Sequence, residues 1–105
     1  MFSHIMVGAN NVQESKTFYD AILCAMGHKP GVIDAKGRCF YSTKSGVFAL
    51  SNPINGEPAS NGNGSTMGFS ARTTAIADDW HAAGIANGGI TARIISVYNL
   101  YAIEK

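Results

Sequence analysis

The sequence predicts an α+β protein built from two related modules, of which the second is the shorter. Three observations lead to this prediction. Residues 2–26 read as a strand, a capped turn and an amphipathic helix, and three short strands follow them. After a polar segment, the strand-and-helix plan begins again. We therefore expect a single domain that consists of module 1 (residues 1–51), a linker (residues 52–64) and a shortened module 2 (residues 65–105).

The first strand has two chemically different faces. Successive side chains of a strand point in opposite directions, so Ile5 and Val7 share one face, and His4, Met6 and Gly8 share the other. We expect Ile5 and Val7 to pack beneath the helix that follows. This leaves His4 on the opposite face of the sheet.

The first helix carries clear start and stop signals. Asn11 and Glu14 have the spacing of a capping box, and Gly27 lies where a left-handed residue ends a helix. Apolar residues recur between these signals at helical spacing and predict one buried stripe. They are Val12, Phe18, Tyr19, Ile22, Leu23 and Met26.

Short strands complete module 1. We expect them at residues 32–34, 38–43 and 47–51, separated by turns, which gives the order βαβββ. Residues 52–64 follow, with two prolines, three glycines and four asparagines, and this composition excludes regular structure. The segment is interpreted either as a solvated linker or as a loop over the mouth of a pocket.

Module 2 repeats the beginning of this plan. Residues 65–71 alternate as in a half-buried strand, and Thr73 or Thr74 caps a helix over roughly residues 75–87. Only two further strands fit in the remaining sequence, at residues 91–97 and 99–103. We therefore expect module 2 to be shortened.

Composition excludes several classes of function. The chain has 105 residues, 46% of them hydrophobic and 14% charged, and its net charge is +1. The basic residues are scattered, and no apolar run reaches the roughly 18 residues of a membrane span, so we expect neither nucleic acid nor a membrane as a partner. Cys24 and Cys39 have no metal-site spacing, and with no leader sequence visible they are expected to be reduced thiols in the cytoplasm.

The order of the motifs resembles the glyoxalase/bleomycin-resistance/extradiol-dioxygenase superfamily, the vicinal oxygen chelate proteins. The resemblance begins at His4, Ile5, Val7, Asn11, Val12, Ser15, Phe18, Tyr19 and Gly27, and it continues through residues 37–41, 46–50 and 67–71. It implies paired βαβββ modules that form a curved mixed sheet around a cleft. Compared with such relatives, the C-terminal module lacks about a strand and a loop. An exposed sheet edge tends to pair with another chain, which favours a homodimer.

The resemblance also implies where a metal would be held. Carried over position by position, the superfamily's ligand sites fall on His4, Ala49, Thr66 and Tyr101, of which only His4 is a competent ligand. A stable site needs three or four protein ligands. We therefore expect no cofactor and no metal, with His4 as a polar residue of the cleft. A divalent metal (Zn, Fe, Mn or Ni) is expected only if the protein is a metal-dependent enzyme of the glyoxalase type.

The resulting hypothesis is metal-free binding of a small, partly apolar molecule in a cleft. The cleft candidates are His4, Met6, Ala49, Thr66, Ser70 and Tyr101. Two alternatives stay open: a metal-dependent lyase, isomerase or dioxygenase of the glyoxalase type, and an interaction protein without a ligand.

Four further side chains are weighed for chemistry. Cys39 is either a reactive thiol or a packing residue, and Arg38 either holds an anionic ligand or is exposed. Asp20 and Asp34 are expected on the outside of module 1. None of these four residues is assigned a catalytic role.

Overall fold

A computed structural model describes residues 1–60, 65–97 and 100–104 of the chain, and describes side-chain surroundings as far as Gly89. In sequence order, its elements are β1 (His4–Gly8), α1 (Val12–Ala25), β2 (Val32–Ile33), β3 (Cys39–Thr43), β4 (Gly46–Ser51), β5 (Phe69–Ser70), α2 (Thr74–Ala86), β6 (Ile90–Val97) and β7 (Leu100–Glu104). None of the helices in these described ranges is long and apolar enough to cross a membrane.

Module 1 forms one mixed four-stranded sheet, called sheet A below, in the order β1-β4-β3-β2. Strands β1 and β4 run parallel, with His4 opposite Val47 and Val7 opposite Leu50. The remaining neighbours are antiparallel. Together with α1, these strands confirm the βαβββ module that the sequence predicts.

Helix α1 begins and ends where its capping residues predict. The Asn11 Oδ1 accepts the backbone N–H of Glu14 at 3.0 Å, and Gly27 has a φ of +89°. Its buried side chains pack on sheet A to form one apolar core. This core consists of Phe18, Ile22, Leu23, Cys39, Tyr41, Phe48 and Leu50, together with Trp80 from α2.

The two faces of β1 differ as the alternation predicts, although only one inward residue reaches the core. Val7 packs against the core, whereas Ile5, on the same face, is 38% exposed. His4 and Met6 lie on the opposite face, because side chains alternate along a strand and Ile5 and Val7 are the register partners of the core residues Phe48 and Leu50. The expectation that Ile5 packs beneath α1 is therefore wrong, and a pocket described below accounts for its exposure.

Module 2 departs from the predicted plan. Strands β5, β7 and β6 form a separate antiparallel sheet, called sheet B, so only one βαβββ module is evident in the described part of the chain. The strand predicted over residues 65–71 is reduced to Phe69–Ser70, because pairing with β7 is confined to those two residues. Within the described residues, the two sheets do not join into one curved sheet.

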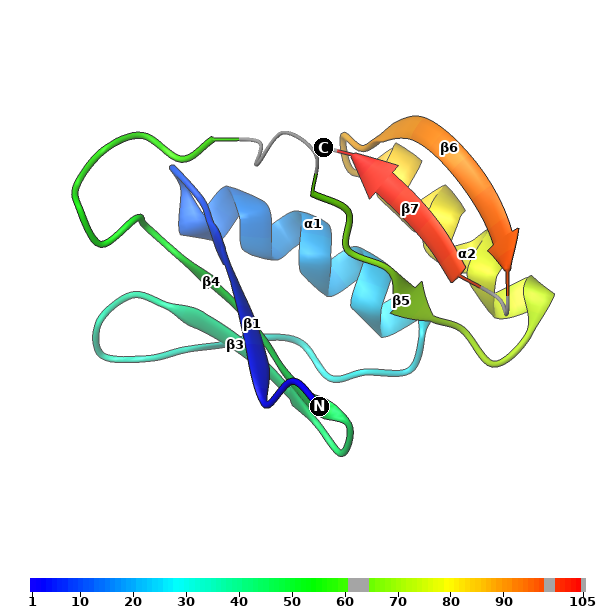
Figure 1. Cartoon of the computed structure of the whole chain (residues 1–105), viewed down its shortest axis with the longest axis horizontal. Helices are drawn as coiled ribbons and strands as arrows, with labels where there is room; N and C mark the ends of the chain where they lie inside the picture. Colours follow the sequence, from blue (N-terminus) through cyan, green and yellow to red (C-terminus); the bar gives the residue numbers. More distant parts are fainter. Residues whose placement is uncertain (61–64, 98–99, 105) are drawn as a thin grey trace.

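Helix packing joins the two modules. Figure 1 shows α1 between sheet A and sheet B, with α2 lying beside β6 and β7. A chain of aromatic rings crosses this junction. The Phe48 ring centroid lies 5.9 Å from that of Tyr41 and 5.5 Å from that of Phe69, and Phe69 lies 6.4 Å from Trp80. Apolar packing therefore connects the two modules.

A polar cluster fixes α1 against the β2–β3 region. The Asp20 carboxylate accepts the Lys16 ammonium at 2.6 Å, the Gly31 N–H at 2.9 Å and the Tyr41 hydroxyl at 2.7 Å. Burial raises the pKa of Asp20, but these three donors outweigh it and hold the pKa below its usual value. The sequence suggested that Asp20 lies on the outside of module 1. This expectation is wrong, because the Asp20 carboxylate faces Tyr41.

Candidate ligand pocket between the modules

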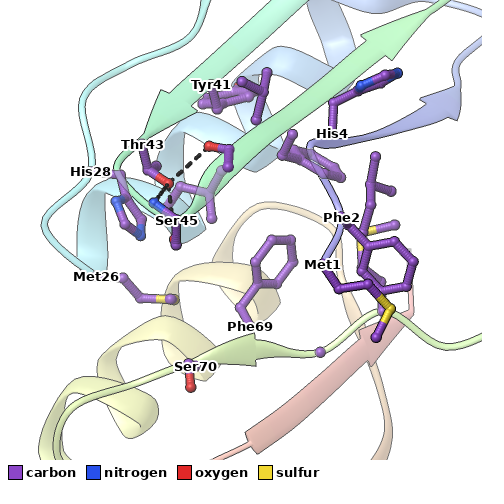
Figure 2. A pocket seen from close by; sticks show the side chains of 17 residues that line it. Met1, Phe2, His4, Met26, His28, Tyr41, Thr43, Ser45, Phe69 and Ser70 are labelled. Atoms are coloured by element: carbon purple, nitrogen blue, oxygen red, sulfur yellow. Dashed lines mark hydrogen bonds between the residues drawn. The ribbon is translucent and has the colours of Figure 1, made fainter.

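A cavity of about 460 Å³ lies between the two modules (Figure 2). Four parts of the chain form its wall: residues 1–5, residues 23–28 at the end of α1, residues 41–48 of the β3–β4 hairpin, and residues 67–70 around β5. Segments from both modules therefore meet at one hollow.

Most of the wall is apolar. The apolar lining residues are Met1, Phe2, Ile5, Leu23, Met26, Val47, Phe48, Met67 and Phe69. Figure 2 shows Phe69 directed into the space and Met1 and Phe2 at one side of it. Three of these side chains are methionines, whose flexible thioethers adapt to ligands of different shape.

One end of the cavity is polar. His28, which follows the left-handed Gly27, lies beside the β3–β4 turn that carries Thr43 and Ser45 (Figure 2). The Thr43 hydroxyl donates to the Gly46 carbonyl at 2.9 Å and accepts the Ser45 N–H at 3.3 Å. These bonds shape the turn so that the Ser45 hydroxyl, 3.1 Å from Thr43 Oγ1, lies at the cavity.

The lining residues that the structure describes include no aspartate, glutamate, lysine or arginine. Its titratable side chains are His4, His28 and Tyr41. Burial is the main cause of a strongly raised pKa of the Tyr41 phenol, and the hydrogen bond to Asp20 is the second cause. The phenol therefore stays neutral. A largely uncharged wall with a few polar groups is typical of small-molecule sites.

Comparison with solved structures identifies the fold. The chain is similar to the crystal structure of a glyoxalase/bleomycin resistance protein from Albidiferax ferrireducens T118, with 53% sequence identity and a TM-score of 0.84. The match covers 89% of this chain and 74% of that chain. The chain belongs to the glyoxalase/bleomycin resistance family. No family model matches the sequence, and no curated protein matches it significantly.

Two of the six predicted cleft residues, His4 and Ser70, border the described pocket. Met6 and Ala49 are register partners on the face of sheet A that points away from α1, and neither lines the pocket. Thr66 is exposed before β5. Tyr101 lies opposite Phe69 in β7, and its side chain is outside the described surroundings.

His4 and Ser70 both border the pocket, but neither side chain points into it. In Figure 2 the His4 ring turns away from Phe69, and the Ser70 hydroxyl points to the far side of β5. Alternation explains both directions, because Ile5 and Phe69 occupy the inward positions beside them. A cleft built from the six predicted residues stays a prediction.

The surroundings of His4 do not fit a metal centre. Its Nδ1 lies 2.8 Å from the Ser3 hydroxyl, and its register partner is Val47. Ala49, the next position of β4 on that face, has no donor atom. Among the described residues, no group of three or more His, Cys, Asp or Glu side chains is placed to hold a metal ion. We therefore derive no chemistry through a metal.

Arg38 and Cys39 both have structural partners. The Arg38 guanidinium forms an ion pair with Asp34 at 2.5 Å and lies 5.1 Å from the centre of the Phe40 ring. Cys39 is completely buried, and burial raises the pKa of its thiol. A raised pKa disfavours the reactive thiolate, so the packing interpretation of Cys39 fits the structure.

Sequence reasoning missed the polar end of the pocket. The strand and turn patterns predict Thr43 at the end of a strand and His28 and Ser45 in turns, and they do not indicate that the three residues meet. One signal was available: the Gly27 C-cap turns the chain sharply, and this brings the next residue, His28, back towards the sheet.

Proposed function

We propose that this protein binds a small, partly apolar molecule in the pocket between its modules and does so without a metal. The observation that carries the proposal is the pocket itself. Its volume of about 460 Å³ falls within the roughly 300–1,000 Å³ typical of ligand sites. Apolar side chains supply the area for binding, and His28 and Ser45 supply polar groups that orient a ligand.

Metal independence is proposed from the residues that surround His4. An enzyme of the glyoxalase type needs several donors around its ion, and the positions beside His4 in sheet A hold valine and alanine. A metal-dependent lyase, isomerase or dioxygenase would need donors from a second chain. A ligand-free interaction protein is the other alternative, and the cavity argues against it.

We also propose that a second copy of the chain covers the free edge of β1. Edge strands are normally protected by charges or proline. The β2 edge has Lys29, Pro30 and Asp34 around it, whereas residues 1–13, which include β1, contain no lysine, arginine, aspartate or glutamate. Several large apolar side chains are exposed here instead: Met1, Phe2, Ile5 and Met6. An uncharged apolar edge can pair with a copy of itself without repulsion.

A thermal-shift screen of small molecules in excess EDTA tests the proposal. Binding to the folded state raises the apparent unfolding temperature in a saturable way. We expect hits among partly apolar molecules, with the same shift in EDTA and in added Zn²⁺. A ligand that shifts the transition only when metal is present would overturn metal-free binding. A screen without any saturable hit would support the ligand-free alternative.

A further inference from the structure

The two ends of the pocket differ in a way that defines the chemistry of its ligand. Met1 and Phe2 lie at one end, and His28, Thr43 and Ser45 at the other (Figure 2). A molecule that fills this space therefore has an apolar body and one polar group. The position of that group is set by the hairpin turn.

The polar end supplies hydrogen-bond donors. The Thr43 hydroxyl donates its hydrogen bond to the Gly46 carbonyl and so is not a donor for a ligand. The Ser45 hydroxyl can rotate from Thr43 Oγ1 towards a ligand, and the Thr43 oxygen then still accepts the Ser45 N–H. An imidazole N–H of His28 is the second donor. Two hydrogen-bond donors at the polar end of the pocket favour a ligand group that accepts through two oxygens.

The charges near this end are positive. Lys29 follows His28, and Lys44 stands between Thr43 and Ser45; both lysines are exposed. No carboxylate is found among the described residues of the lining. The nearby Asp20 is already engaged by Lys16 and Tyr41. An anionic group would therefore meet donors and positive potential here, without a facing acid.

We propose that the ligand is an amphipathic carboxylate whose carboxylate group lies between His28 and Ser45 and whose apolar body extends past Phe69 towards Phe2. This inference rests on the proposed function, since it names the class of molecule that the same pocket takes. Hydrogen bonds with a charged partner are roughly twice as strong as neutral ones, which gives the preference for the anion.

Octanoate and 1-octanol are the matched probes, because they share chain length and differ in the charged group. Binding can be followed through Trp80, the one tryptophan of the chain, whose ring lies 6.4 Å from that of the pocket residue Phe69. We expect octanoate to bind about tenfold more tightly than octanol at neutral pH. Calorimetry checks the two dissociation constants.

Variants locate the carboxylate. The double variant His28→Gln/Ser45→Ala should lose most of the preference for octanoate. Lys44→Met should also reduce this preference, by about the amount that added salt removes in the wild type. Lys36→Met, in the β2–β3 turn, is the matched control and should leave the preference unchanged. Lys44 is exposed, so its variant reports on binding even if the double variant folds poorly.

The outcomes separate this inference from the proposed function. Equal affinity for octanol and octanoate, or a preference that survives both the double variant and Lys44→Met, would overturn the carboxylate site and leave apolar binding intact. Failure of both probes to bind would contradict the carboxylate site and count against the pocket as well.

Discussion

Replacing Gly31 with alanine is expected to lower the free energy of unfolding by about 3 kcal/mol. The segment before β2 approaches sheet A so closely that a Cβ at this position would press on the Cys39 Sγ and lie 2.7 Å from Tyr41 Cζ. Neither neighbour can easily give way. Cys39 is fully buried inside the sheet, and the Tyr41 hydroxyl is held by Asp20 at 2.7 Å.

A second effect adds to this overpacking. The Gly31 N–H donates to Asp20 at 2.9 Å, so a shift of the backbone away from the clash would also lengthen that bond. Urea denaturation of the wild type, Gly31→Ala, Cys39→Ala and the double variant gives a double-mutant cycle. We expect the double variant to be more stable than the sum of the single effects predicts. Simple additivity would contradict the proposed clash with Cys39.

Replacing Ile5 with the larger tryptophan should reduce ligand affinity by at least about tenfold, or 1.4 kcal/mol. Ile5 lines the pocket on the face of β1 that points towards α1. It is 38% exposed, so a larger ring there takes up pocket volume without displacing core residues. The fold should therefore survive while the pocket is blocked.

Met6→Trp is the matched control. Met6 is the next residue of the same strand, is 44% exposed and lies on the opposite face. Calorimetric titration of octanoate into both variants compares the two faces directly. Loss of binding in Met6→Trp with retention in Ile5→Trp would place the ligand on the open face of sheet A, where the resemblance to relatives placed the cleft.

Local signals in the sequence were sufficient to predict the ends of α1 and the two faces of β1. The Asn11 cap, the left-handed Gly27 and the period-two pattern of β1 each depend on the conformation of a few neighbouring residues, and the structure confirms all three. The family resemblance is confirmed as well. Such signals are strong because local geometry alone decides them.

Non-local features could not be predicted in the same way. Strand β5 is short because its pairing with β7 covers two residues, and no pattern within residues 65–71 records where a partner strand ends. The exposure of Ile5 likewise depends on the pocket that it lines together with Phe69 of β5, and no pattern within β1 records that pocket. The position of Asp20 beside Tyr41 depends on a contact 21 residues apart in sequence.

A native mass spectrum of protein purified without chelator distinguishes a metal-free pocket from a metal centre. We expect peaks that correspond to two 11.1-kDa chains with no bound metal, and added octanoate should then increase the mass by one molecule per chain. A dimer that carries one Zn, Fe, Mn or Ni per chain would contradict the metal-free pocket. That result would mean that donors from two chains meet at His4.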